Sequence, residues 1–416
     1  MENQKYIKQQ NNDLELYCGV LSIPLVFCTV ANYTFTSLFG GYILFGLYVF
    51  SFVSLLIFSR RQKKVEFDIK SLLAFLCFAF VYAFSIFLTN NINNNMLNIV
   101  FFSVAVFYGL AIVYNATNPK ILRYISVVSL ISVAISVVLS VIVLIEEPGA
   151  SRILASSAFE VYGASKFRSQ GLAGFGLTYA LIFFIPILLY WIKISKKKGK
   201  VLITLFAVLV VINIILSGYT TALILGVLAI CAYFFINAKP YPKLFFILFL
   251  VMFILFQSYF LPDLLYSISE LMGSKQMADH IVEIADILAG KSVVDDLGRT
   301  QLMKQSWNSF LLNPLFGGYV NSIDTELGGH STFFDVLGGT GLLGFVPYCL
   351  FTYLFYKQVK TQIKNIKIKK VWAVETVVFF ALQIFNPIIA NYEIIYAYMC
   401  VAPAMLFYTD LIGESQ

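Results

Sequence analysis

Apolar runs of about 20 residues, separated by short polar segments, occupy most of the chain. An α-helix needs a run of this length to cross the hydrocarbon core of a bilayer. Apolar residues make up 59% of the 416 residues and charged residues only 12%, whereas charged residues are about a quarter of a soluble globular domain. The sequence therefore predicts an all-α integral membrane protein and excludes a soluble globular fold.

The lengths of the apolar runs predict about twelve transmembrane helices. We expect them at residues 16–36, 38–58, 71–89, 96–115, 122–145, 171–192, 201–217, 219–237, 243–261, 332–356, 371–389 and 392–410. Residues 1–416 would then form a single polytopic membrane domain.

The 29 lysines and arginines are unevenly shared between the expected loops. Most lie in the N-terminal segment and in the loops after the second, fourth, sixth, eighth and tenth spans. Because basic loops stay in the cytoplasm, both termini are predicted to be cytoplasmic. This topology accounts for the net charge of +7, so we expect no nucleic-acid partner. The basic residues left over lie in the loops after spans five and nine: Arg152, Lys166, Arg168, Lys275, Lys291, Arg299 and Lys304.

The segment 262–331, between the ninth and tenth spans, is too long for a loop without internal structure. We expect a large, helical extracytoplasmic loop that carries part of the active site. One of its helices should begin at Thr300, a suitable N-cap, and end at Asn313-Pro314. Arg299 would then lie beside a helix N-terminus, an arrangement that binds phosphate. One face of this helix carries Met303, Trp307, Phe310 and Leu311.

The seventh and eighth spans share only the residues from Val201 to Asn237. Their turn, Ser217 to Thr221, would lie near membrane depth, which is tolerated only where protein or a water-filled cavity surrounds it. This hairpin suggests a cavity that opens to the outside.

Three side chains on the predicted outer side carry the candidate chemistry. Arg168 and Arg299 can bind a pyrophosphate through bidentate hydrogen bonds. His330 lies at the mouth of the tenth span and can act as a general base. Each residue also has a structural interpretation: Arg168 as an interfacial cation, Arg299 as a solvated loop residue and His330 as a helix-cap residue.

Four further residues are possible accessory groups. Arg152 and Lys166 are surface cations that could contact phosphate, while Asp335 and Glu393 lie near the outer ends of spans ten and twelve. Either carboxylate could orient His330 or a sugar hydroxyl, or could simply be interfacial. The second of the two histidines, His280, is expected to be a surface or packing residue. No metal site or cofactor is expected, because the sequence has no His-x-x-x-His and no Asp-x-Asp motif.

The block from Gly298 to Gly344 resembles the C-terminal signature of the O-antigen ligase and Wzy-type polymerase family. The resemblance rests on Gly298-Arg299-Thr300, Asn313-Pro314, His330-Ser331, and Gly341 with Gly344; Arg168 followed by Gly171 resembles the family's Arg-x-x-Gly. Two departures stand out. Thr220 occupies a position where the family usually has arginine, and Leu-Ala-Gly-Phe-Gly follows Gly171 in place of an Asn-containing segment. Arg152 or Lys166 could supply the cation that is absent at Thr220.

The resemblance implies a GT-C-like membrane glycosyltransferase of the bacterial inner membrane, with its active site facing the periplasm. Its donor would be an oligosaccharide linked to undecaprenyl pyrophosphate, and its acceptor a sugar hydroxyl on another lipid-linked repeat unit. Arg168 and Arg299 would stabilise the leaving pyrophosphate and His330 would take the proton, without a metal ion. A flippase and a chain-length regulator are possible protein partners.

Three functions remain open at this point. The first choice is a polymerase of O-antigen or capsule, and the second is a ligase that transfers the glycan to a different acceptor. A lipid-linked oligosaccharide flippase or another transporter is the alternative from a different class. A flippase should carry cations across the depth of the bundle, whereas here they cluster at one face.

Overall fold

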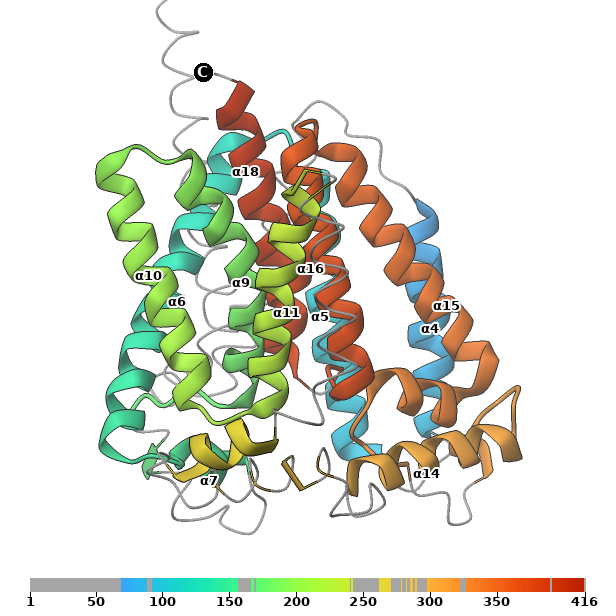
Figure 1. The fold of residues 1–416 in the computed structure, drawn as a ribbon. Coiled ribbons are helices and arrows are strands. Elements are labelled where there is room, and N and C mark those ends of the chain that lie inside the picture. The colour runs from blue at the N-terminus through green and yellow to red at the C-terminus, as the bar shows by residue number, and fades with distance from the viewer. Residues whose placement is uncertain are drawn as a thin grey trace, which may run out of the picture.

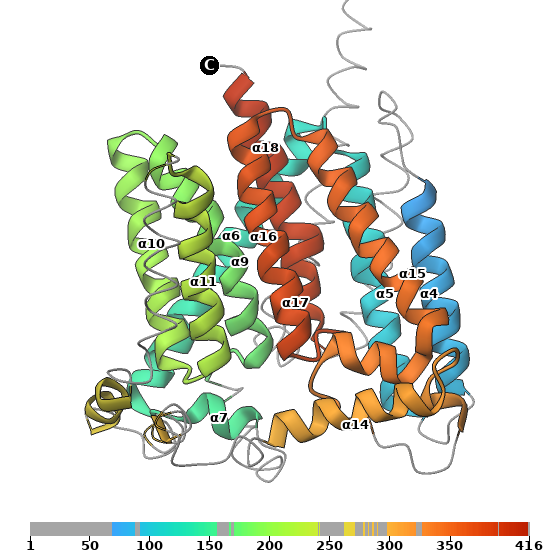
Figure 2. The same ribbon diagram turned by 45° about the vertical axis from the view of Figure 1, so that its right-hand side comes forward.

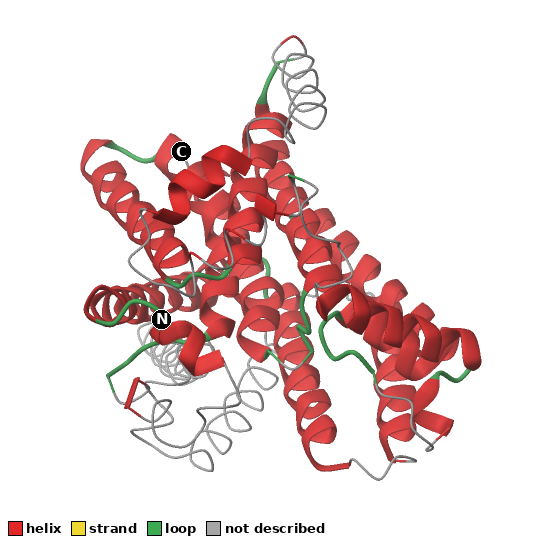
Figure 3. Cartoon of the chain, turned by 60° about the horizontal axis from the view of Figure 1, so that its bottom comes forward, coloured by secondary structure: helices red, strands yellow, loops and turns green. Residues whose placement is uncertain are grey.

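The computed structural model describes residues 69–87, 92–155, 166–167, 170–239, 241, 262–270, 298–321, 327–389 and 391–414, with isolated positions between 278 and 289. All regular elements in this part of the chain are helices, and Figure 3 shows them without any strand. The expected spans 16–36, 38–58 and 243–261 lie outside the described residues, as do Arg168 and His280.

The long helices coincide with the remaining expected spans. They are α4 (Ile69–Phe87), α5 (Ile92–Tyr114), α6 (Pro119–Glu146), α9 (Phe175–Ile194), α10 (Lys197–Leu216), α11 (Thr220–Asn237), α15 (Thr332–Gln362), α16 (Ile366–Phe385) and α17 (Tyr392–Tyr396), which continues through a π-helical turn (Ala397–Val401) into α18 (Ala402–Glu414). In the described part, seven helices are long and apolar enough to cross a membrane. The prediction of an all-α membrane protein is confirmed, while the total of twelve spans stays a prediction.

The helices run up and down, so that their connections gather at two opposite ends (Figure 1). The lysine-rich connections α9–α10 and α15–α16 lie at the end where α18 finishes. The short helix α7 (Ala150–Ala155), the α10–α11 turn and α14 (Gly298–Leu312) lie at the other end. This separation agrees with the alternation in the basic residues, and we call the second end the α14 end. Its location outside the cytoplasm is a prediction from the positive-inside rule.

Small polar side chains allow α6 to pack closely within the bundle. The helix begins with Asn118, whose side chain accepts hydrogen bonds from the backbone N–H groups of Lys120 and Ile121, and Pro119 occupies the first turn. Its buried face carries serines, as is common where membrane helices approach each other: Ser126, Ser129, Ser132, Ser136 and Ser140.

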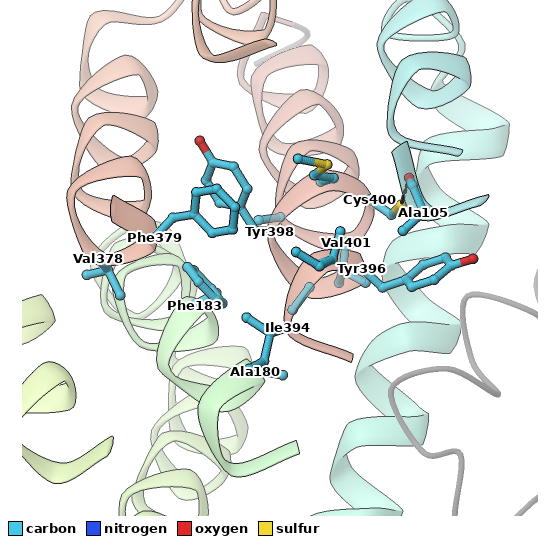
Figure 4. Packing of buried hydrophobic residues seen from close by; sticks show 14 of the residues in the cluster. Ala105, Ala180, Phe183, Val378, Phe379, Ile394, Tyr396, Tyr398, Cys400 and Val401 are labelled. Atoms are coloured by element: carbon cyan, nitrogen blue, oxygen red, sulfur yellow. Dashed lines mark hydrogen bonds between the residues drawn. The ribbon is translucent and has the colours of Figure 1, made fainter. Parts of the chain in front are cut away.

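Aromatic stacking holds the centre of the bundle together (Figure 4). The ring of Tyr398, in the π-helical turn, stacks on Phe379 with centroids 3.8 Å apart and on Trp372 at 4.9 Å. The Tyr398 hydroxyl is 3.1 Å from that of Thr376, which satisfies both groups away from water. These contacts join α16 to the last helix.

Candidate functional site

The helix α15 is interrupted near the α14 end by a break at Gly341, which has φ 60° and ψ −161°. Only glycine adopts this backbone conformation without strain. The break frees the N–H groups of Leu342 and Leu343, which donate instead to the carbonyls of Pro314 and Leu315 at 2.9 and 3.1 Å. The first part of α15 therefore turns aside from the rest and docks against the end of α14 (Figure 2).

Glycines also allow α14 and the first part of α15 to touch through their backbones. A Cβ atom at Gly338 would overlap the carbonyl oxygen of Ser306, and one at Gly328 would overlap that of Leu302. Ser309 adds a hydrogen bond from its hydroxyl to the carbonyl of Gly338, at 3.1 Å. The two segments therefore form one unit at this end of the bundle.

The helix α14 starts two residues earlier than predicted. It spans Gly298–Leu312, so Thr300 lies within the first turn and the prediction that it is the N-cap is wrong. The prediction that Asn313-Pro314 ends the helix is confirmed. The backbone of Arg299 lies in the first turn, as expected for a residue near a helix N-terminus, although its side chain is outside the described part.

A carboxylate on α15 holds the loop that carries His330. Oδ1 of Asp335 accepts hydrogen bonds from the Ser306 hydroxyl at 2.6 Å and from the Gly329 N–H at 3.2 Å. Its Oδ2 accepts from the Ser331 N–H at 3.0 Å. Asp335 therefore fixes the backbone on both sides of His330, and the two side chains are close enough for their charges to interact.

Ser306 supports the same loop from α14. It is fully buried, and its hydroxyl oxygen accepts a hydrogen bond from the Gly328 N–H at 3.0 Å while donating to Asp335. The sequence analysis did not single out Ser306. It lies in the middle of the predicted helix, three residues before Ser309, and no pattern in the sequence distinguishes it.

The start of α15 is tied to the end of α16. The Ser331 hydroxyl caps α15 by accepting from the Phe334 N–H and donates to the carbonyl of Gln383 at 3.2 Å. The N–H and hydroxyl of Thr332 both donate to the carbonyl of Asn386, at 3.1 Å each. His330 itself is exposed. Its loop therefore lies between α14 and the α16–α17 connection.

Two tyrosines that the sequence analysis did not single out lie beside the first part of α15, where Tyr319 packs on Gly339. Tyr319, in the 3-10 turn Gly318–Asn321, hydrogen-bonds Tyr82 of α4, and their rings are 6.1 Å apart at nearly right angles. Burial and the neighbouring Tyr82 raise the pKa of the Tyr319 phenol well above its usual value, with a smaller effect from Asp335. Tyr319 therefore stays neutral at physiological pH, when it can donate a hydrogen bond.

The backbone on either side of Arg168 is ordered against α6. The N–H of Leu172 donates to the carbonyl of Phe167 at 3.0 Å, and the N–H of Ala173 donates to the Ser140 hydroxyl at 2.9 Å. Gly171, with φ 87°, makes the turn between these bonds and packs on Leu139. The segment from Lys166 to Gly174 therefore leads into α9 at the α14 end, although Arg168 itself is not described.

The structure also locates the two predicted accessory cations, Lys166 and Arg152. Lys166 forms an exposed ion pair with Glu147, so its charge is partly neutralised. Arg152 is in α7, with its side chain outside the described part. The Tyr219 hydroxyl donates to the carbonyl of Ser151 at 2.7 Å, which places α7 over the α10–α11 turn. The helix α7 therefore covers part of this turn, and Thr220 is the first residue of α11.

Glu393 is buried and contacts α9. Its side chain is 5% exposed, and its carboxylate lies directly against Gly176 in the first turn of α9. A carboxylate is favourable at a helix N-terminus because the helix dipole is positive there. This packing brings Glu393 beside the segment that follows Arg168.

A comparison with protein families finds one match. The family model described as O-antigen ligase matches residues 205–349, a stretch that includes α14, Arg299 and the loop with His330, and the resemblance to this family is confirmed there. Arg168 and Glu393 lie outside the matched stretch. No curated protein and no solved structure matches the chain.

Proposed function

We propose that this protein is a membrane glycosyltransferase that polymerises surface polysaccharide, using a glycan linked to undecaprenyl pyrophosphate as donor. The observation that carries the proposal is the loop of His330, which Asp335 and Ser306 hold beside α14, within the stretch that matches the O-antigen ligase family. An exposed histidine on a firmly held loop is suited to act as a general base.

The reaction needs one proton transfer and one displacement. His330 takes the proton from an acceptor sugar hydroxyl, whose oxygen forms a bond to the anomeric carbon of the donor. The bond between that carbon and the pyrophosphate oxygen breaks, and undecaprenyl pyrophosphate leaves with the electron pair. The protein must stabilise the negative charge that develops on the leaving oxygen.

Arg299 is the first candidate for stabilising that charge. It lies in the first turn of α14, where free backbone N–H groups and the helix dipole also favour an anion. Leu302, three residues further on, contacts Gly328, which is two residues before His330. The first turn of α14, which contains Arg299, therefore lies near the loop that carries His330. Arg168 would act from the segment that leads into α9.

A ligase is the second candidate function, because the matched family model carries that description. Both enzymes would use the same donor and the same chemistry, so they differ only in the acceptor. A flippase is less well supported. Where the structure describes the burial of lysines and arginines, none is buried, although a carrier of pyrophosphate would need cations across the depth of the bundle.

One reconstitution experiment separates the three functions. The purified protein in vesicles receives a lipid-linked repeat unit with a fluorescent glycan, with and without a second glycan acceptor. A ladder of longer chains on undecaprenyl pyrophosphate supports the polymerase, and label on the second acceptor supports the ligase. Movement of an unchanged substrate across the membrane would support the flippase and contradict both enzymes.

A further inference from the structure

The helix α14 packs on α15 with one side and presents two other sides that are exposed. Ser306 and Ser309, 0% and 3% exposed, face α15. Gln301 and Asn308, seven residues apart and therefore on one side of the helix, are exposed polar residues, and this side ends in Leu312, which is 73% exposed. Trp307 and Leu311, four residues apart, form a third face that is apolar and also exposed, at 43% and 56%, with the exposed Lys304 at its edge.

This third face continues into the turn after the helix. Leu315 and Phe316 are 56% and 50% exposed. The carbonyl of Leu315 accepts from the N–H of Leu343, so this turn lies against α15 at its break. We refer to Trp307, Leu311, Leu315 and Phe316 together as the α14 apolar face.

The α14 apolar face is contiguous with an exposed apolar surface of α15. Leu342, Leu343, Val346 and Leu350 are exposed along α15, which is apolar and long enough to cross a membrane. Leu342 and Leu343 are bonded through their backbones to the turn at Pro314 and Leu315. Trp307 also lies next to α15, because the centroid of its ring is 6.5 Å from that of Phe334 in the first turn of that helix.

We propose that the α14 apolar face is embedded in the interfacial layer of the bilayer, so that α14 lies in the membrane plane. A helix with one protein-facing, one polar and one apolar face that includes tryptophan has the composition of an interfacial helix. The four side chains would remain in contact with water if the α14 end projected clear of the membrane, at a cost of about 25 cal/mol per Å² of apolar surface.

This placement sets the height of the candidate site relative to the membrane. α14 carries Arg299 at its start and supports the His330 loop through Ser306, so both would lie at the level of lipid phosphates. If the proposed function is correct, the pyrophosphate of a lipid-linked donor reaches them by diffusion within the bilayer. The location of α14 can be measured without any substrate. Its test is therefore independent of the test of the proposed enzymatic function.

Tryptophan fluorescence measures this location directly. The chain has three tryptophans; Trp372 is fully buried and Trp191 partly buried. The difference in emission between the wild type and Trp307→Phe, in nanodiscs, therefore reports Trp307. A matched control places the fluorophore on the polar face, as Asn308→Trp in the Trp307→Phe background.

The proposal predicts that lipids brominated near the headgroup end of the acyl chain quench most of the Trp307 emission, while iodide in the water quenches little. The control should show the reverse order. Strong quenching of Trp307 by iodide and none by bromine would show that α14 projects into water. Quenching by neither would show that protein, either another segment or a second copy, covers the face. Both of these results would overturn the proposal.

Discussion

The Ser306 hydroxyl of α14 lies 2.6 Å from Oδ1 of Asp335 in α15, and this bond joins the two helices on either side of the segment that carries His330. Asp335 accepts two further hydrogen bonds from the backbone on either side of His330. Removal of either side chain should therefore act on the histidine without touching the substrate.

Asp335→Ala should lower turnover by roughly ten- to a hundredfold, since a hydrogen bond to a charged group is worth about 1.5–3 kcal/mol and about 1.4 kcal/mol is a factor of ten. Turnover should fall more than the KM for the donor rises. Asp335→Asn should be intermediate, because the amide keeps one acceptor oxygen. Initial rates on membranes with matched protein levels measure this, with Asn308→Ala on the exposed polar face of α14 as the control. An Asp335→Ala variant with normal turnover would mean that the loop does not need this support.

The contact between α14 and α15 depends on a glycine that has no room for a side chain. Gly338→Ala would push a methyl group into the Ser306 carbonyl, and overpacking of this kind costs about 1–3 kcal/mol. We expect a lower melting temperature in detergent and a loss of activity. Gly413→Ala is the matched control, because a Cβ at that position meets no atom within 4 Å. Equal melting temperatures for the two variants would contradict the close packing.

Arg299 should stabilise charge in the transition state. Arg299→Ala should cost about 2–4 kcal/mol, the effect of losing one donor that stabilises developing charge. Arg299→Lys should restore only part of the activity, because lysine cannot make the bidentate contact. The same order is expected for Arg168, while Lys304→Ala, an exposed residue of α14, should stay close to wild type. Full polymer yield from both lysine variants would exclude the arginines as pyrophosphate clamps.

The two ends of the bundle should face opposite sides of the membrane. A reporter that is active only outside the cytoplasm should work when it is fused near Ser292, in the segment that precedes α14. It should fail near Thr361, at the lysine-rich end of α15. The reverse pattern would invert the topology and move the candidate site to the cytoplasm.

The sequence predicted the long helices well, because apolar runs and basic loops directly report where a chain can cross a bilayer. Asn313-Pro314 also marked the end of α14 correctly, since the residue before proline rarely stays helical. Predictions of this kind depend on neighbouring residues. They succeeded for the long helices and for the end of α14, whereas the N-cap expected at Thr300 was wrong.

The arrangement around His330 could not be derived in this way. Ser306 and Asp335 are separated by 29 positions, and nothing local to either residue indicates that both would bind the same loop. The sequence analysis singled out the apolar face of α14, whereas Ser306 and Ser309 make the closest contacts with α15, because a glycine there allows the backbones to meet. The break at Gly341 is likewise a tertiary feature, since its freed N–H groups find partners only in a distant turn.

The central claim is that His330 accepts the proton of the acceptor hydroxyl. A histidine can accept a proton only in its neutral form. Loss of this base should therefore remove most of the activity in His330→Ala. That variant should still bind the lipid-linked donor.

The most direct measurement is the rate of glycan transfer by His330→Gln on membranes with matched protein levels, beside His280→Ala as the control. Glutamine keeps a hydrogen bond but cannot accept a proton at neutral pH. We predict that His330→Gln is nearly as inactive as His330→Ala and that His280→Ala is close to wild type. An active His330→Gln would reduce His330 to a hydrogen-bonding residue, and an inactive His280→Ala would show that the other histidine carries the chemistry.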